Sequence, residues 1–318
     1  MSSVRTTSLL AVALVCAVFA VPAHAAETLR VGKAVPESFA FVPLDIGMHE
    51  GIYQRNGIDV EEIAFAGDAK LQQAMAADSL DIALGSGPAM AFIAKGAPTK
   101  AIAVMGSPPL DLTIVVRPDG PKTAAELKGK KVSVSTVGGL TYWLVSETSR
   151  QQGWGPNGID IAPMGGMPPQ IIALERGDID GVVTDISTAL ELERLGRARI
   201  LTRFGQIVKD FHVHIIYATD RVIANRPDAV RGFLKGWFES IGFMRKHKSE
   251  SVTIATQVIG KDDSINSKTY DELMPMFSND GRFDQKALDT LAKSYVELKV
   301  LPAEPDMTKL YTEAFLPK

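Results

Sequence analysis

The sequence predicts an α/β protein built from two similar lobes. Short apolar strands alternate with helical segments along the chain, which is typical of parallel sheets covered by helices. The phrase Gly57-Ile58-Asp59-Val60 returns as Gly158-Ile159-Asp160-Ile161, each time at the same distance from an earlier apolar strand. Each copy is followed by a strand that begins with aspartate, at Asp81 and at Asp180. Two such units on one chain usually enclose one cleft, where a ligand binds.

The first lobe is expected to begin with a strand over 29–33 and a helix over 41–53 that has one apolar face. Asp68 is a candidate N-cap for a second helix, and Pro88 stands early in a third helix, where proline is accepted. The remaining strands of this part are expected over 58–63, 80–84, 102–105 and 111–116.

The second lobe repeats this alternation. Thr123 and Glu126 have the spacing of a capping box for a short helix. A strand over 213–218 leads back out of the lobe, and from Pro227 onward the pattern becomes largely helical. The other elements of the second lobe are expected as strands over 131–134, 159–161 and 182–184, and as helices over 140–152, 169–176 and 186–195. The helices expected after Pro227 are 228–246 and 284–298.

Residues 1–25 are expected to be a cleavable signal peptide. Arg5 precedes an apolar run that is short for a membrane span and ends at the small-residue site Ala23-His24-Ala25. An N-terminal membrane anchor is the less favoured alternative, because no stop-transfer charges follow. Cys16, the single cysteine, lies inside this run, so the mature chain is expected to have no disulfide. Export without disulfides favours a bacterial periplasm.

The lobes are expected to divide the rest of the chain unevenly. The first lobe should comprise 26–116 and 217–318, and the second lobe 117–216. The chain would then cross between the lobes near Val116-Arg117 and near Ile216-Tyr217. Two crossings form a hinge between the lobes.

Composition and motifs favour a protein that binds a small molecule. Hydrophobic residues make up 46% and charged residues 22% of the chain, with a net charge of −3, as in globular proteins. No basic stripe indicates a nucleic-acid partner. Sequence motifs for a serine nucleophile, a zinc site or a nucleotide-binding loop are absent, so we expect no enzyme and no cofactor, although dispersed catalytic groups leave no motif. We expect a monomer.

The loop Ser135–Thr141 is the sharpest candidate for a ligand contact. It joins a strand to a helix N-terminus, at the strand end where parallel α/β sheets bind ligands. Free N–H groups and the helix dipole favour an anion there, and Gly138 and Gly139 let it approach the backbone closely. A plain strand-to-helix turn is the alternative. Tyr142, in the helix that follows, is a further candidate.

Other strand ends supply weaker candidates. Ser86 and Gly87 repeat the loop chemistry in the first lobe, although helix capping explains Ser86 equally well. Phe39 is favoured over Phe41 as an aromatic wall, because Phe41 fits the core. Asp185 could hold an amine or a hydroxyl group, or could cap the next helix.

His212 and His214 form an H-x-H pattern on an expected strand, which directs both side chains to one face. A metal site needs further ligands, and the surrounding sequence supplies none. We therefore do not expect a metal ion there.

The order and spacing of these segments resemble the sulfonate/taurine/nitrate-type periplasmic substrate-binding proteins (the SsuA/TauA/NMT1-like group). The resemblance rests on segments spread over nearly the whole mature chain: Ser38–Leu44, Gly51-Ile52-Tyr53, Gly57–Val60, Leu80–Ala83 with Gly85-Ser86, Leu127–Val132, and the helix start at Gly138-Gly139.

This resemblance implies the class II periplasmic-binding-protein fold, two α/β lobes with a hinge and an inter-lobe cleft. It implies capture of a small solute and delivery to the permease of an ABC importer with its ATPase. Many members carry two serines where Gly139-Leu140 stands here, so sulfonates, carboxylates and heterocycles all stay open as ligands. Carried over by position, the cleft would be lined by Ser38, Phe39, Asp68, Ser86, Gly138, Gly139, Thr141 and Asp185.

Overall fold

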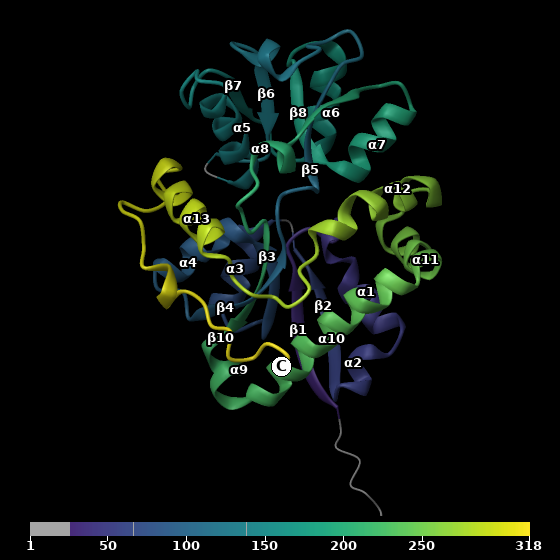
Figure 1. The fold of residues 1–318 in the computed structure, drawn as a ribbon, viewed down its shortest axis with the longest axis vertical. Helices are drawn as coiled ribbons and strands as arrows, with labels where there is room; N and C mark the ends of the chain where they lie inside the picture. Colours follow the sequence, from purple (N-terminus) through teal and green to yellow (C-terminus); the bar gives the residue numbers. More distant parts are fainter. Residues whose placement is uncertain (1–25, 66, 138) are drawn as a thin grey trace, which may run out of the picture.

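The computed structural model describes residues 26–65, 67–137 and 139–318, and it contains two five-stranded sheets in two lobes (Figure 1). Lobe I, the lower lobe in Figure 1, has the strand order β2-β1-β3-β10-β4. Strand β1 is parallel to β2 and β3, whereas β10 is antiparallel to β3 and β4. These strands are β1 (Glu27–Lys33), β2 (Ile58–Ala64), β3 (Ile82–Ser86), β4 (Thr99–Gly106) and β10 (His214–Thr219).

Lobe II has the strand order β7-β6-β8-β5-β9. Strand β6 is parallel to β7 and β8, and β5 is antiparallel to β8 and β9. The alternating pattern of the sequence therefore predicted two α/β lobes, and the structure confirms them. The strands are β5 (Leu112–Val116), β6 (Lys131–Val134), β7 (Asp160–Pro163), β8 (Gly181–Asp185) and β9 (Arg199–Arg203).

Helices cover both sheets. The α-helices of lobe I are α1 (Val42–His49), α2 (Ile52–Arg55), α3 (Asp68–Ala76), α4 (Met90–Ala94), α9 (Asp220–Asn225), α10 (Pro227–Lys246), α11 (Lys248–Ile259), α12 (Asp263–Leu273) and α13 (Gln285–Glu297). Lobe II contains α5 (Leu140–Gln151), α6 (Met167–Arg176), α7 (Ile186–Arg194) and α8 (Phe204–Ile207). The 3₁₀ helices are η1 (Phe39–Phe41), η2 (Gly87–Ala89), η3 (Ala124–Leu127), η4 (Met274–Met276) and η5 (Met307–Lys309).

The helix expected over 41–53 is divided into three pieces. The chain forms η1 and α1, and then reverses at Gly51 before α2 begins. Gly51 has φ 64°, a left-handed conformation that glycine adopts without a steric penalty. The apolar periodicity continues across this break, which explains why the pattern predicts a single helix.

The lobe boundaries differ from those expected. Strand β5 belongs to the sheet of lobe II, and β10 belongs wholly to the sheet of lobe I. The chain therefore crosses through a first connection, residues 107–111, and a second connection, residues 208–213. The boundary predicted at 116/117 is wrong because it places β5 in lobe I, although β5 pairs with β8 and β9 of lobe II. The boundary predicted at 216/217 is wrong because it divides β10, all of which pairs with β3 and β4 of lobe I.

The aspartates directly before β3 and β8, Asp81 and Asp180, have the same role in each lobe. Asp81 accepts the main-chain N–H of Arg30 at 3.0 Å, and Asp180 accepts that of Lys131 at 2.9 Å. Each carboxylate thus ties the start of one strand to its parallel neighbour. Asp81 also pairs with three guanidinium groups, those of Arg30, Arg221 and Arg226. The aspartate that recurs in the two halves of the sequence therefore has a structural role in each lobe.

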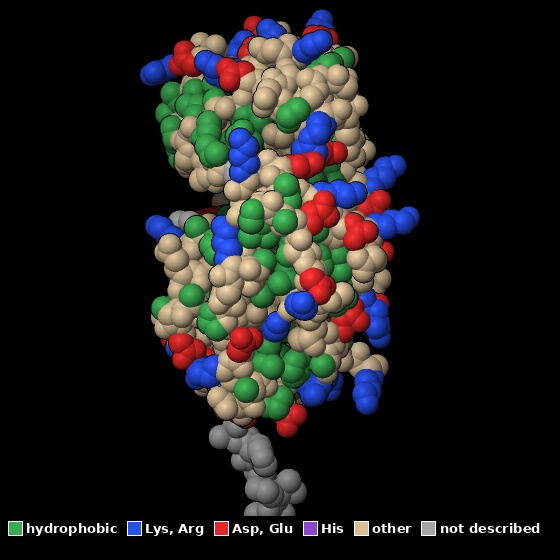
Figure 2. Space-filling view, turned by 90° about the vertical axis from the view of Figure 1, so that its left-hand side faces the viewer, with side chains coloured by type: hydrophobic (Ala, Val, Ile, Leu, Met, Phe, Trp, Pro, Cys, Tyr) green, Lys and Arg blue, Asp and Glu red, His purple; other side chains and the backbone are tan. Residues whose placement is uncertain are grey.

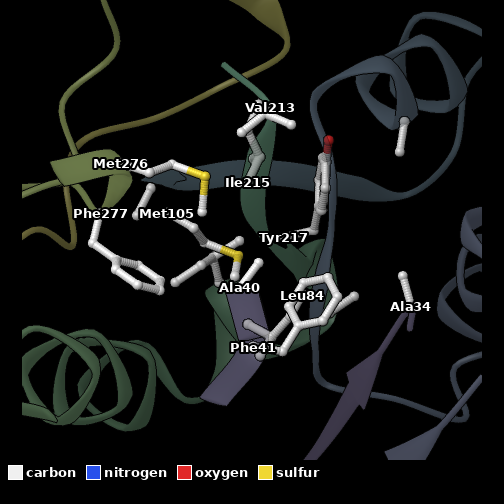
Figure 3. Packing of buried hydrophobic residues seen from close by; sticks show 14 of the residues in the cluster. Ala34, Ala40, Phe41, Leu84, Met105, Val213, Ile215, Tyr217, Met276 and Phe277 are labelled. Carbon is white, nitrogen blue, oxygen red and sulfur yellow. The ribbon is translucent and has the colours of Figure 1, made fainter. Parts of the chain in front are cut away.

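The core of lobe I continues to the second connection. Figure 3 shows Val213, from that connection, above Ile215, with Met276 and Met105 to the left and Tyr217 to the right. All five side chains are buried. Within the described residues, no helix is both long enough and apolar enough to cross a membrane.

Candidate functional site

The space between the lobes is bordered by strand ends from both sheets. Ser86 at the end of β3 pairs with His214, the residue after the second connection. Asp185 at the end of β8 pairs with Leu112, the residue after the first connection. Figure 2 shows a notch in the outline of the molecule between the two lobes. The candidate site is therefore this inter-lobe notch.

On the lobe I side, Ser86 and Asp68 form one hydrogen-bonded unit. The main-chain N–H of Ser86 donates to Asp68 Oδ1 at 2.9 Å, and Tyr217 donates its hydroxyl to the Ser86 carbonyl at 2.6 Å. Tyr295 donates to the carbonyl of Gly87 at 3.2 Å. Gly67, not Asp68, is the N-cap of α3, so the predicted cap is wrong by one position. The Asp68 carboxylate instead braces the strand end.

Ser38 and Phe39 begin the short helix η1. The Ser38 hydroxyl accepts the N–H of Ala40 at 3.3 Å and so caps this helix. Phe39 is 2% exposed and packs edge-on against Tyr270, with the ring centroids 6.5 Å apart. We expected Phe39 to face the ligand and Phe41 to lie in the core. This contrast is wrong, because the side chains of both residues are buried.

On the lobe II side, the loop before α5 is exposed over residues 135–137. Gly138 lies outside the described residues. Gly139 is the N-cap of α5 and has no side chain that could occupy the helix N-terminus. The Thr141 hydroxyl accepts the N–H of Ser135 at 3.3 Å, which folds the loop onto the helix. Tyr142 is half-buried against the core.

Asp185 caps α7. Its Oδ1 accepts the N–H of Thr188 at 2.9 Å and the hydroxyl of Ser187. Of the two roles that the sequence left open for this residue, helix capping is the one that the structure contains. The carboxylate is half-buried beside the first connection.

The two histidines lie among different neighbours. His212 is in the second connection, outside the strand that was expected to carry both residues, and His214 begins β10. Burial lowers the pKa of His212 to about 4, against the opposing effect of Asp284. Burial also lowers the pKa of His214, but the facing Asp111 carboxylate raises it more, so the net shift is upward. Within residues 26–65, 67–137 and 139–318, no cluster of three His, Cys, Asp or Glu residues is placed to bind a metal ion.

Two exposed apolar residues at the strand ends are not singled out by the sequence analysis, although Val137 lies in the predicted loop Ser135–Thr141. Val35 follows β1 and is 47% exposed, and Val137 follows β6 and is 72% exposed. They occupy corresponding loops of the two lobes. Their signal in the sequence is a valine two or three residues after the end of an apolar strand.

Two shallow surface pockets lie away from the notch. One of about 320 Å³ lies in lobe II beside Arg117 and Asp180, and one of about 350 Å³ lies in lobe I beside Thr99 and Leu310. None of the predicted site residues lines either pocket.

The solved structures with the same fold include periplasmic binding proteins. The aliphatic sulphonate binding protein SsuA from Escherichia coli superposes with a TM-score of 0.76 over 90% of this chain and 92% of its own, at 18% identity. The nitrate-binding protein NrtA from Synechocystis PCC 6803 superposes with a TM-score of 0.70 over 91% of this chain and 86% of its own, at 16% identity. These similarities confirm the expected periplasmic-binding-protein fold.

Sequence comparison identifies the family. A curated relative, a "Putative thiamine biosynthesis protein" of Haemophilus influenzae, is 21% identical over 268 residues, which cover 81% of this chain and 82% of the relative. The family model described as "NMT1/THI5 like" matches residues 38–251, which include both connections and all of lobe II. The chain therefore belongs to the NMT1/THI5-like family.

Proposed function

We propose that this protein is a periplasmic solute-binding protein that captures a small organic solute and delivers it to an ABC importer. The observation that carries the proposal is the pairing of two α/β lobes whose ligand-binding strand ends border one notch and which two connections join. The names of the structural relatives, which bind sulphonate and nitrate, support a small anionic ligand.

The acidic group of the ligand would bind on the lobe II side. The N-terminus of α5 begins at Gly139, and its first N–H groups and helix dipole favour a negative charge. Lobe I presents the Asp68 carboxylate at its strand end, which repels an anion. Val35 and Val137 would contact the apolar part of the ligand.

The partners and the location follow from this role. The protein would act as a monomer in the periplasm, reached through its N-terminal signal segment, and would dock on a permease coupled to an ATPase. Transport proteins of this kind release the solute unchanged, so the proposal excludes conversion of the ligand. An enzyme or a ligand sensor on the same fold is the alternative.

A thermal-shift screen followed by calorimetry tests the proposal. Alkanesulfonates, small carboxylates and nitrate form the first panel, because bound ligand raises the melting temperature by mass action. We expect stoichiometric binding by a member of the panel, with the compound recovered unchanged. Chemical conversion of the bound compound would contradict the transport role, and the lack of binding across this first panel would contradict an acidic ligand.

A second ligand class has one specific observation in its favour. The relative from Haemophilus influenzae is named for thiamine biosynthesis, which points to the heterocyclic precursors of thiamine. A second panel of aminopyrimidines and thiazoles tests this class. Tight binding from this panel alone would replace the acidic ligand with a heterocycle and would leave the transport role intact.

A further inference from the structure

Two histidines that the proposed site does not use tie the two connections together. His212 faces Ser107 of the first connection, with 2.7 Å between Nδ1 and Oγ. His214 faces Asp111, the last residue of the first connection, with 2.6 Å between Nε2 and Oδ2. Two hydrogen bonds between the connections therefore account for the H-x-H pattern of the sequence.

Both pairs are buried, so their geometry is fixed by the surroundings. His212 is 3%, His214 7% and Asp111 4% exposed. The main-chain N–H of Asp284 donates to His212 Nε2 at 3.0 Å, so a neutral His212 ring carries its proton on Nδ1 and donates it to Ser107. Phe41 packs edge-on against the His214 ring, with the centroids 5.2 Å apart. Hydrogen bonds in such low-dielectric surroundings are stronger than those at the surface.

Asp111 bonds to both lobes at once. Its carboxylate accepts from His214 in the lobe I sheet. Its carbonyl oxygen accepts the N–H of Ile186 at 2.8 Å, at the start of α7 in lobe II. The next residue, Leu112, pairs with Asp185 in the β5–β8 ladder. A rotation of one lobe against the other must therefore turn about Asp111 or break one of these bonds.

Other polar contacts between the lobes each include a partly exposed side chain, and Arg150 with Glu297 and Lys261 with Glu191 are two of them. Arg203 of β9 donates two hydrogen bonds of 2.9 Å to Glu272 of α12. Trp143 of α5 donates to Glu297 of α13 at 3.0 Å. The Arg203 and Glu272 side chains are 32% and 31% exposed, and exposed ion pairs contribute about 1 kcal/mol or less. These contacts therefore restrain the lobes less than the buried pair does.

We infer that Asp111 is a positioning residue that sets the relative orientation of the two lobes, through its side chain to His214 and its main chain to Ile186. The inference goes beyond the transport role and does not depend on which solute binds. It places the centre of lobe motion where Asp111, the last residue of the first connection, meets His214, which pairs with Ser86 at the end of β3.

Spin labels on the two lobes test this inference. Asp59 in β2 and Asp160 in β7 are exposed and lie in different lobes. With Cys16→Ser, the chain has no other cysteine, so Asp59→Cys and Asp160→Cys can be labelled selectively. Pulsed dipolar spectroscopy of the protein without added solute then gives the distribution of distances between the lobes. We expect Asp111→Ala to broaden or shift this distribution.

Matched variants separate positioning from a loss of stability. Asp111→Asn keeps an oxygen that can accept from His214, so it should retain the narrow distribution. Asp45→Asn removes a buried carboxylate within lobe I, where Asp45 pairs with Lys33, and should also leave the distribution unchanged.

If Asp111→Ala does not fold, the double variant Asp111→Leu/His214→Leu replaces it, because apolar replacement of both partners of a buried pair is tolerated. A distribution as narrow and as centred as that of the wild type in the alanine or the double-leucine variant would overturn the inference.

Discussion

Gly87 is the position where lobe I approaches the second connection most closely, and its replacement by alanine tests how tightly the two are packed. A Cβ at this position would lie well inside contact distance of the His212 carbonyl oxygen, and 3.1 Å from Leu291 Cδ2. The neighbour is backbone on one side, so it cannot turn away as a flexible side chain could. Either η2 or the second connection must move.

The expected loss in the free energy of unfolding follows from the hydrogen bonds that such a movement breaks. The Gly87 N–H donates to the Val213 carbonyl at 2.9 Å, and the Gly87 carbonyl accepts from Tyr295 at 3.2 Å. Each bond contributes about 1 kcal/mol, and an overpacked core costs a further 1–3 kcal/mol, so we expect a loss of roughly 3–5 kcal/mol. At roughly 2–4 °C per kcal/mol for a chain of this size, the melting temperature should fall by about 10 °C.

Urea and thermal unfolding of Gly87→Ala measure this loss, and Gly242→Ala is the matched control. Gly242 lies inside α10, where an added Cβ would meet no neighbouring atom within 4 Å. Alanine there should raise the stability by about 0.5–1 kcal/mol, because glycine is a poor helix former. A Gly87→Ala variant as stable as the wild type, with the control behaving as expected, would refute this reasoning. The packing of η2 against the second connection would then have room for a Cβ at position 87.

Three further predictions concern buried charges. Asp81→Asn removes a buried carboxylate shared by three guanidinium groups, of which Arg221 keeps its pairing with Asp78, and should cost about 3 kcal/mol. Asp180→Asn, at the equivalent and more exposed position of lobe II, should cost about 1 kcal/mol or less; equal losses in urea unfolding would contradict the difference. The pKa of His212 is lowered to about 4, so this group reduces stability as the pH falls from about 6.5 toward 4, and His212→Asn should flatten that part of a melting-temperature profile. Burial raises the pKa of Asp45 to about 6, so this group stabilises the folded state increasingly as the pH falls from about 6 toward 3.8. Asp45→Asn should remove this gain in melting temperature. A melting-temperature profile against pH that is unchanged by His212→Asn or by Asp45→Asn would refute the cause assigned to that residue.

The lobe architecture was predictable because its signals are local. The apolar runs that became β1, β3, β6 and β8 are short, bounded by turns, and spaced alike in the two halves of the chain. The strand ends that border the notch were predictable for the same reason, since the end of a parallel strand is visible in the sequence.

The details of the candidate site were less predictable, because they depend on distant neighbours. Phe39 and Phe41 are two residues apart and equally apolar, and the sequence carries no sign that η1 buries both. Aspartate is a residue type that favours helix N-caps, yet the Asp68 carboxylate accepts the main-chain N–H of Ser86, which lies in another element. The bond of Asp111 to His214 joins residues that are far apart along the chain.

The sequence by itself determined the two-lobe α/β plan, the family resemblance and the edge of the sheets at which a ligand would bind, because strand, helix and turn preferences act over a few residues. Only the tertiary structure decided to which lobe β5 and β10 belong. A strand of either lobe has the same apolar pattern, so its lobe is set by the strands to which it is hydrogen-bonded, and these lie far along the chain. The tertiary structure also decided that the two histidines face Ser107 and Asp111, since a side chain finds its partner only after both connections lie side by side.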